Sequence, residues 1–211
     1  MNLANWLFWN VDTQVDFMLP QGKLYVSGAE LIVPKLKKLT KLALTNSIRV
    51  VSTADFHYED SKELSLNPDY VETFPPHCMA NTSGAKYITE TNPKDPIIFE
   101  WKKNFNISAK ISEIEKHRNI VIRKDAFNVF EGNPFTDEII SAIYPETVVV
   151  YGVATNVCVN DAVIGLAKRV KYVYVIEDAI KELPNIPLPF ETWKKLGVKM
   201  ITLNDLENLI S

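Results

Sequence analysis

The sequence predicts an α/β protein in which a central, mostly parallel, Rossmann-like sheet of about six strands lies between two layers of helices. Two observations carry this prediction. Short apolar runs alternate along the chain with stretches whose apolar residues recur at helical spacing. The chain also has the length of one domain, at 211 residues, so we expect residues 1–211 to form a single three-layer unit.

The predicted strands are the apolar or β-branched runs that end at turn residues. They lie at 7–11, 49–53, 97–99, 120–123, 147–151 and 172–176, with an edge strand near 200–203. The predicted helices are the amphipathic stretches between these runs. They lie at 30–45, 108–117, 136–143, from 158 onward, 190–196 and 205–210.

One long stretch, at about 56–96, shows neither pattern and is rich in Pro, Asn, Ser and Thr. A segment of this kind inside a compact domain usually carries a binding site or a lid. We therefore expect this irregular segment to hold part of the functional site.

Composition bears on the partners and the compartment. The net charge of −3 gives no reason to expect nucleic acid or an anionic membrane surface as a partner. No apolar run approaches the length that spans a bilayer, and the N-terminus lacks the features of a signal peptide. The two cysteines, Cys78 and Cys158, suit a reducing compartment, although a single bridge between them stays open. We therefore expect a soluble, cytoplasmic protein.

Cys158 has the most informative position in the chain. The strand at 147–151 ends at Gly152, and apolar residues recur at helical spacing from Asn156 onward, so the cysteine lies at a strand-to-helix turn. Unpaired N–H groups and the helix dipole favour an anion there and would push the thiol toward thiolate. One interpretation is a nucleophile for covalent catalysis, and the other is a small buried core residue.

Two further polar residues end predicted strands, at the edge where open α/β sheets bind ligands. Asp12 could cap a turn, or it could take the thiol proton and return it to a leaving amine. Lys124 could reach solvent, or it could be a buried cation that stabilises Asp12 and the thiolate. Because independent surface residues would not converge at one edge, the pattern favours catalysis.

A candidate set of metal ligands follows the second predicted strand and continues into the irregular segment: Asp55, His57, Glu63 and His77. Two of the 3 histidines of the chain fall in this set. Two imidazoles with carboxylates suit zinc, and also iron or manganese. Cys78 could be a further ligand, although a small buried residue is its commoner role.

Taken together, these residues resemble the nicotinamidase branch of the isochorismatase-like cysteine hydrolases. The resemblance runs from about Trp9 to Ile176. It rests on segments that occur in the family's order: VDTQVDF, QGKLYVSGAE, STADFH, FPPHCMANTSGAK, the lysine strand end and GVATNVCV. The FPPHC segment together with DFH is typical of the metal-containing nicotinamidases.

The resemblance implies a catalytic triad of Asp12, Lys124 and Cys158. It also implies an oxyanion hole formed by the backbone N–H groups of Ala154 and Cys158, with a cis peptide bond between Val153 and Ala154.

The resemblance further implies that the four candidate ligands hold a divalent metal, with zinc as the first choice and iron or manganese as alternatives. Glu63 stands where many relatives have a histidine ligand.

Phe17 and Phe74 match positions whose rings sandwich a pyridine. Many nicotinamidases have an acidic residue in place of Asn156, and the segments 92–106 and 127–132 also differ from the usual nicotinamidase loops.

The expected function is hydrolysis of nicotinamide to nicotinate and ammonia through a cysteine thioester, a step of NAD salvage. One alternative is another amidase of the superfamily, acting on a ureido, carbamoyl or small aliphatic amide, often without a metal. A catalytically silent binding module is a further alternative. Isochorismatase itself cleaves a vinyl ether without a cysteine, so Cys158 argues against that activity. Relatives are often homo-oligomers.

Overall fold

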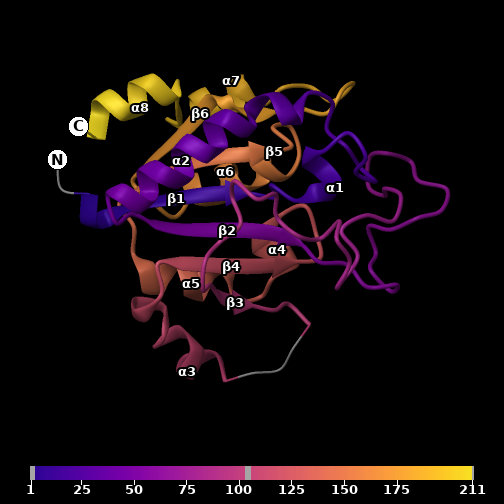
Figure 1. Cartoon of the computed structure of the whole chain (residues 1–211), viewed down its shortest axis with the longest axis horizontal. Helices are drawn as coiled ribbons and strands as arrows, with labels where there is room; N and C mark the ends of the chain where they lie inside the picture. The colour runs from indigo at the N-terminus through magenta and orange to yellow at the C-terminus, as the bar shows by residue number, and fades with distance from the viewer. Residues whose placement is uncertain (1–2, 103–105, 211) are drawn as a thin grey trace.

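The computed structural model describes residues 3–102 and 106–210, and its centre is a seven-stranded sheet (Figure 1). Residues 103–105, inside the unusual segment 92–106, lie outside the described residues. The strands are β1 (Trp6–Val11), β2 (Arg49–Asp55), β3 (Ile97–Phe99), β4 (Asn119–Lys124), β5 (Thr147–Val153), β6 (Tyr172–Lys181) and β7 (Lys199–Ile201).

The strand order across the sheet is β3-β4-β2-β1-β5-β6-β7, and every neighbouring pair is parallel. The predicted parallel sheet is confirmed. It has seven strands rather than about six, because the short run near residue 200 pairs with β6 as a true edge strand.

The helices alternate with the strands along the chain. They are α1 (Val15–Met18), α2 (Val33–Thr45), α3 (Ile107–Ile111), α4 (Val129–Gly132), α5 (Thr136–Ile143), α6 (Cys158–Ala167), α7 (Phe190–Lys195) and α8 (Leu203–Ile210), with 3-10 turns η1 (Leu3–Asn5), η2 (Ala29–Ile32) and η3 (Ile114–Lys116). Among the described residues, no helix is both long and apolar enough to cross a bilayer.

The prediction of one helix over 108–117 is wrong, because the chain forms α3 and then η3 there. Ser112 caps the end of α3, and its hydroxyl donates a hydrogen bond to the carbonyl of Ala109 at 2.6 Å. A serine side chain that bonds to the nearby backbone competes with the helical pattern in this way. The short helices α1 and α4 are too brief for periodicity to predict.

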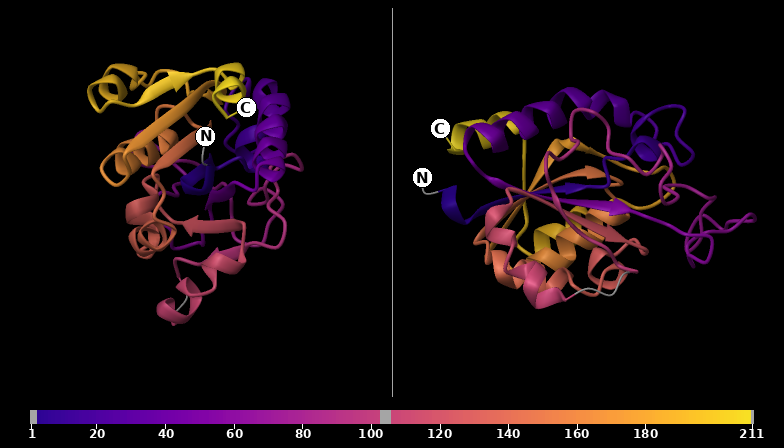
Figure 2. Two further views of the ribbon diagram at one scale, coloured as in Figure 1. Left: turned by 90° about the vertical axis from the view of Figure 1, so that its left-hand side faces the viewer. Right: turned by 60° about the horizontal axis from the view of Figure 1, so that its bottom comes forward.

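Helices cover both faces of the sheet (Figure 2). In β1, Trp6 and Phe8 face a core that includes α2 and α8, whereas Leu7, Trp9 and Val11 face a second core that includes α5, α6 and α7. Successive strand residues point to opposite faces, so a strand buried on both faces is continuously apolar. The predicted three-layer α/β/α architecture is confirmed.

The carboxyl ends of the central strands meet at one edge. The chain builds the sheet to one side of β1 and then, from β5 onward, to the other, which makes β1 a topological switch point. Asp55 pairs in register with Lys124, and Val11 pairs with Gly152. Gly152 has a φ of +122°, and a Cβ there would lie 2.1 Å from the Val11 carbonyl oxygen, so close contact at this edge requires glycine.

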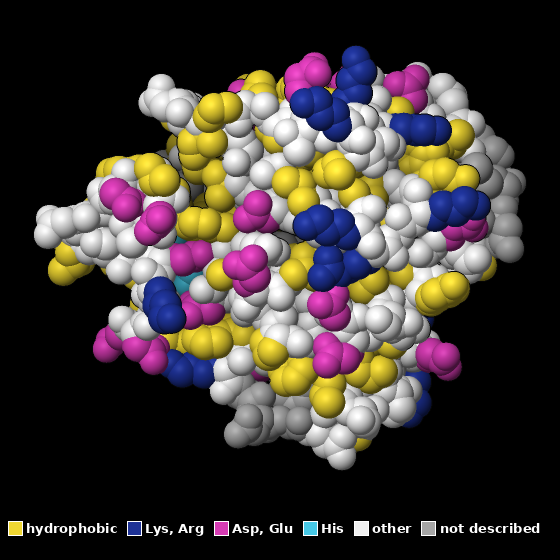
Figure 3. Space-filling model, turned by 180° about the vertical axis from the view of Figure 1, so that it is seen from behind, with side chains coloured by type: hydrophobic (Ala, Val, Ile, Leu, Met, Phe, Trp, Pro, Cys, Tyr) yellow, Lys and Arg dark blue, Asp and Glu magenta, His cyan; other side chains and the backbone are white. Residues whose placement is uncertain are grey.

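The irregular segment 56–96 contains no helix or strand among its described residues, as expected, and projects beyond this edge at the right of Figure 1. Seen from behind, the projecting lobe shows apolar side chains among acidic ones (Figure 3). Its exposed large apolar residues are Leu66, Tyr70 and Val71.

Candidate functional site

Lys124 lies at the centre of a buried charged cluster. It is the last residue of β4, and its side chain is 1% exposed. Its Nζ lies 3.0 Å from Asp12 Oδ2 and 3.7 Å from Cys158 Sγ. The same ammonium donates a hydrogen bond to Oδ1 of Asp55, the last residue of β2. Asp12 directly follows β1 and Cys158 begins α6, so the structure brings the three residues of the expected triad together.

Burial raises the pKa of the Cys158 thiol well above its usual value, although Lys124 opposes this. Burial thus acts against the expected push of this thiol toward thiolate, because the effect of removal from water on its pKa is larger than that of Lys124. Burial also raises the pKa of Asp12, whereas for Asp55 burial is outweighed by Lys124, His57 and His77 together and the pKa falls well below its usual range. Of the two carboxylates, Asp12 is therefore the one suited to accept a proton.

The Asp12 carboxylate has one oxygen engaged and one available. Oδ1 accepts a hydrogen bond from Thr53 Oγ1 at 2.6 Å. Oδ2 is buried and has no aligned hydrogen-bond donor among the described residues, although Lys124 lies beside it. The carboxylates of Asp12 and Asp55 and the sulfur of Cys158 each place one atom within 4.8 Å of the others. A proton can therefore pass between the thiol and Asp12 through one water.

The turn before Cys158 has the expected backbone. The Val153–Ala154 peptide bond is cis. The carbonyl of Ala154 accepts hydrogen bonds from the N–H groups of Val157 and Val159, at 3.1 and 3.0 Å. The N–H of Cys158 lies in the first turn of α6, where N–H groups have no acceptor within the helix. This N–H is therefore available to an oxyanion.

Three of the four predicted ligands come together beside the triad. Asp55, His57 and His77 offer ligand atoms that all lie within 4.8 Å of one another. Asp55 Oδ2 lies 3.8 Å from His57 Nε2 and 3.6 Å from His77 Nε2. The Nδ1 atom of His57 lies 2.8 Å from Asp125 Oδ1, and that of His77 lies 2.8 Å from the Pro75 carbonyl oxygen. Since both Nδ1 atoms face acceptors, each ring keeps its proton at Nδ1, and Nε2 is the atom that would lose its proton to bind a metal.

The fourth predicted ligand, Glu63, lies next to His57 but outside that group of three. Its Oε1 accepts the Phe127 N–H at 2.5 Å, and its Oε2 lies 3.7 Å from His57 Nε2. Both Glu63 Oε2 and His57 Nε2 are buried without a hydrogen-bond partner among the described residues. Leaving such atoms unpaired is costly, and a cation would satisfy both.

The electrostatics of this group also favour a cation. Burial lowers the pKa of His57, but Asp125, Asp55 and Glu63 outweigh it and raise the pKa to about 9. The same negative surroundings would attract a divalent ion, so the residues fit a metal site. Cys78 is buried, and its sulfur lies 3.8 Å from the Gly84 carbonyl oxygen, which is a packing position.

A small, mostly apolar cavity leads to the sulfur. It is lined by Phe17, Leu24, Val26, Asp55, Phe74, His77, Phe127, Val153, Ala154, Val157, Cys158 and Leu183. Both aromatic residues expected to sandwich a ring, Phe17 and Phe74, are present. Phe127 was not predicted, and its ring lies edge-on to Phe74 with centroids 5.4 Å apart. None of the described lining residues is a lysine or an arginine.

Two side-chain amides hold the site: Gln14, which sequence reasoning missed, and Asn156, which it noted only as a departure from the nicotinamidase pattern. Gln14 donates to the carbonyls of Asp55 and Ala85, at 2.8 and 2.9 Å, and accepts the Asp55 N–H at 2.8 Å, so it fixes the end of β2. Its place between two aspartates in VDTQVDF is the only local signal.

Asn156 donates to the carbonyls of Leu183 and Ile186, at 2.9 and 2.8 Å, and accepts the Leu183 N–H at 3.0 Å. Asn156 therefore anchors a wall of the cavity through its whole amide group.

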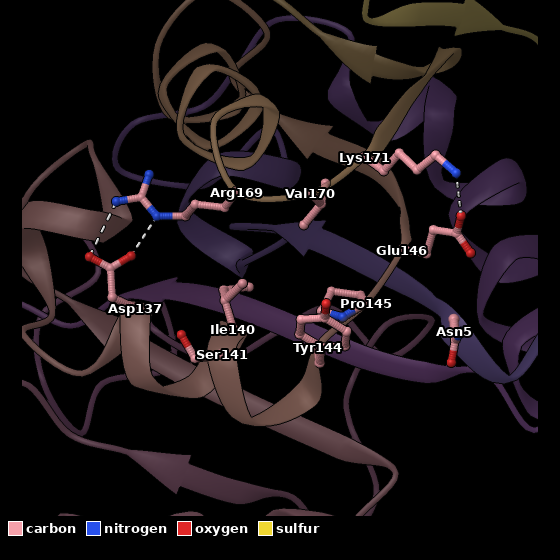
Figure 4. Close-up of a pocket in the computed structure, with 10 residues that line it drawn as sticks. All are labelled: Asn5, Asp137, Ile140, Ser141, Tyr144, Pro145, Glu146, Arg169, Val170 and Lys171. Carbon is pink, nitrogen blue, oxygen red and sulfur yellow. Dashed lines mark hydrogen bonds and ion pairs between the residues drawn. The ribbon is translucent and has the colours of Figure 1, made fainter.

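A larger cavity, of about 700 Å³, opens at the opposite, amino-terminal end of the strands (Figure 4). Arg169 pairs there with Asp137, and Lys171 with Glu146. All four charged side chains in the view are thus already paired, and the cavity contains no nucleophilic thiol or histidine. The described residues that line this cavity therefore offer no group for catalysis of the kind found around Cys158.

Residues 7–185 match the family model described as the isochorismatase domain. The nicotinamidase/pyrazinamidase of Mycobacterium tuberculosis is 35% identical over 77 residues, which are 36% of this chain and 40% of that protein. The aligned segment thus spans less than half the length of this curated relative.

Two solved structures share the fold. The pyrazinamidase of Pyrococcus horikoshii in complex with zinc has a TM-score of 0.71 at 24% identity, covering 94% of this chain and 99% of that one. The N-carbamoylsarcosine amidase from Thermoplasma acidophilum has a TM-score of 0.70 at 21% identity, covering 94% and 96%. At these identities the likeness shows the fold alone.

Proposed function

The chain belongs to the isochorismatase domain family, whose members are hydrolases, and we propose that it converts nicotinamide to nicotinate and ammonia, a step of NAD salvage. The observation that carries this proposal is the position of Lys124. Its ammonium lies against the Cys158 sulfur and the Asp12 carboxylate, at the end of a mostly apolar cavity. A nucleophile, a base and a fixed cation are the groups that amide cleavage through a thioester needs.

In the first half of the reaction Cys158 becomes acylated. Asp12 takes the thiol proton as the sulfur attacks the amide carbon. The N–H groups of Ala154 and Cys158 stabilise the oxyanion, and loss of one such donor typically costs about 3–4 kcal/mol of barrier. Asp12 then gives its proton to the amide nitrogen, the C–N bond breaks, and ammonia leaves. Lys124 stays protonated throughout and offsets the charge on Asp12 and on the sulfur.

In the second half, water releases the acid. Asp12, again a carboxylate, takes a proton from a water molecule, and the oxygen of that water adds to the thioester carbon. The C–S bond breaks, the sulfur of Cys158 regains the proton, and the carboxylic acid product departs. The same base thus serves both steps, so no further titrating group is needed.

Asp55, His57 and His77 would hold the metal, with zinc first and iron or manganese as alternatives, and Glu63 would complete the set. When bound, the ion supplies an anchor for the ring nitrogen of nicotinamide, which is a positioning role. The bonds that form and break lie at the sulfur of Cys158. Proton transfer there is carried out by Asp12.

The cavity favours a flat, uncharged substrate. Phe17 and Phe74 would sandwich an aromatic ring whose carboxamide faces Cys158. Aromatic faces gain more from an apolar ring than from a charged chain, and such ring pairs contribute about 0.5–1.5 kcal/mol beyond burial.

The rival function is cleavage of a carbamoyl or ureido amide, and an N-carbamoylsarcosine amidase does share the fold. A carbamoyl amino acid brings a carboxylate that requires a cation. The described lining residues include no lysine or arginine, Lys124 is already held by Asp12 and Asp55, and the metal is assigned to the ring nitrogen. This observation favours nicotinamide.

The test is ammonia release from nicotinamide, pyrazinamide, benzamide and N-carbamoylsarcosine, each with and without a chelator. Benzamide matches nicotinamide in shape but lacks the ring nitrogen. We expect nicotinamide to be cleaved fastest, and chelation to slow nicotinamide toward benzamide while leaving benzamide unchanged. Fastest cleavage of the carbamoyl compound, without any chelator effect, would support the rival. No turnover of any amide would support a binding module.

A further inference from the structure

The segment after the catalytic lysine is tied to one candidate metal ligand. Asp125, directly after Lys124, accepts a hydrogen bond from His57 Nδ1 with Oδ1 at 2.8 Å. The His57 side chain is 0% exposed and that of Asp125 is 17% exposed. A carboxylate in such a bond holds an imidazole more strongly than a neutral acceptor does.

We infer that Asp125 is a positioning residue that sets the ring orientation and tautomer of His57 for metal binding. This inference rests on the metal site of the proposed function. A carboxylate on Nδ1 keeps the proton there, directs the Nε2 lone pair toward the metal, and raises the basicity of the ligand. The unpartnered Nε2 of His57 is the atom that this orientation presents to Asp55.

The backbone of His57 is fixed independently of Asp125. Its N–H donates to the Cys78 carbonyl at 3.2 Å, and its carbonyl accepts the Ala80 N–H at 2.7 Å. These two bonds form an isolated parallel bridge between His57 and Met79, two residues after His77. Because the main chain is already held, the rotation of the imidazole ring is what remains for Asp125 to set.

Ser61 holds the Asp125 carboxylate in place. Its hydroxyl donates a hydrogen bond to the same Oδ1 atom and accepts the Tyr58 N–H at 2.9 Å. Ser61 is itself buried, so this contact closes the turn after His57 and connects that turn to the end of β4.

The two histidines differ in this respect. The acceptor for Nδ1 of His77 is the carbonyl of Pro75, a neutral group in the same short segment. The acceptor for His57 is a charged side chain from a segment 68 residues away. Substitution at Asp125 should therefore loosen one ligand and leave the other unaffected.

The experiment measures zinc affinity of the metal-free full chain by competition with a chelating dye. We expect Asp125→Ala to weaken zinc binding roughly 10- to 100-fold. Asp125→Asn should weaken it less, since an amide oxygen still accepts the Nδ1–H. Asp60→Asn is the matched control: this nearby carboxylate is 71% exposed and pairs with Lys102, so its loss should leave zinc affinity unchanged.

Thermal melting separates positioning from a merely structural role. In Asp125→Ala the rise in melting temperature on adding zinc should shrink, whereas a structural role would lower the melting temperature of the metal-free chain and leave zinc affinity unchanged. If Asp125→Ala does not fold, Asp125→Asn and Ser61→Ala carry the test, each with weaker zinc binding than wild type.

The outcomes distinguish this inference from the function it rests on. Wild-type affinity in a folded Asp125 variant would overturn the inference and leave the proposed function standing. A wild-type chain that binds no zinc, iron or manganese yet cleaves nicotinamide would overturn the metal site, and the inference with it. Zinc binding weakened by Asp125→Ala but not by Asp60→Asn supports the inference, even where nicotinamide is not cleaved.

Discussion

The triad candidates and the metal candidates share one buried edge, but they are held there by different means. Asp12, Lys124 and Cys158 lie directly at strand ends or at the start of a helix, so the ladders of the parallel sheet place them. His57 and His77 lie in the irregular segment, where isolated bridges and side-chain hydrogen bonds place them. The sheet therefore places the triad candidates and Asp55, whereas isolated bridges and side-chain hydrogen bonds place the two histidines. The two halves should respond separately to substitution.

The largest expected effect is on catalysis through Cys158→Ala. Removing the nucleophile should lower kcat/KM for nicotinamide on the order of 10⁴-fold or more, because the other buried thiol, Cys78, is not among the described residues that line the cavity. Zinc affinity should be unchanged, since the cysteine belongs to the other half. Ammonia release and dye competition measure the two effects. Retained turnover would contradict the scheme, and a parallel loss of zinc would contradict the separation.

The next largest effect is on stability. Lys124→Met should lower the free energy of unfolding by about 3–5 kcal/mol, because it leaves the buried carboxylates of Asp12 and Asp55 without their cation. Urea unfolding measures this. Lys102→Met is the matched control, since an exposed ion pair contributes only about 0–1 kcal/mol. Equal effects of the two substitutions would show that the buried cluster is not charged as described.

The metal half is tested by its ligands. His77→Ala should weaken zinc binding by roughly 100-fold or more, beyond the typical loss of an outer hydrogen-bond partner, and should leave Cys158 available to iodoacetamide. Glu63→Ala decides the number of ligands: a loss as large as that of His77→Ala makes Glu63 a fourth ligand, and a much smaller one makes it a neighbour of His57. Unchanged zinc affinity in His77→Ala would remove this histidine from the site.

The smallest expected effect is on substrate affinity. Phe127→Leu removes the ring that packs edge-on against Phe74, so KM for nicotinamide should rise about 2- to 10-fold, as expected for 0.5–1.5 kcal/mol, with little change in kcat. Tyr144→Ala, in the cavity at the other end of the strands, should change neither constant. A fall in kcat alone would place Phe127 in the chemistry rather than in the pocket wall.

The same division explains which features the sequence predicts. The sheet, its three layers and the strand-end positions of Asp12 and Lys124 follow from local periodicity and from the rule that parallel strands end at one edge. The seventh strand, β7, is short, so only its pairing with β6 shows that it is a strand.

The remaining features depend on contacts between distant residues. Asp125 meets His57, and Phe127 meets Glu63, across more than sixty positions of chain, and no local pattern encodes either contact. The pKa of Cys158 also depends on the whole fold. The helix start is visible in the sequence, whereas the burial that raises the pKa of this thiol arises only in the assembled fold.

The anchor formed by Asn156 has a consequence for how this pocket could diversify. All three of its hydrogen bonds go to main-chain atoms of Leu183 and Ile186, which every amino acid supplies, apart from the N–H that proline lacks at 183. The side chain at position 183, which faces the cavity, is therefore decoupled from the anchor that holds it. Exchange of that residue would reshape the cavity while the main chain stays in place, so position 183 is suited to redesigning which substrate this hydrolase accepts.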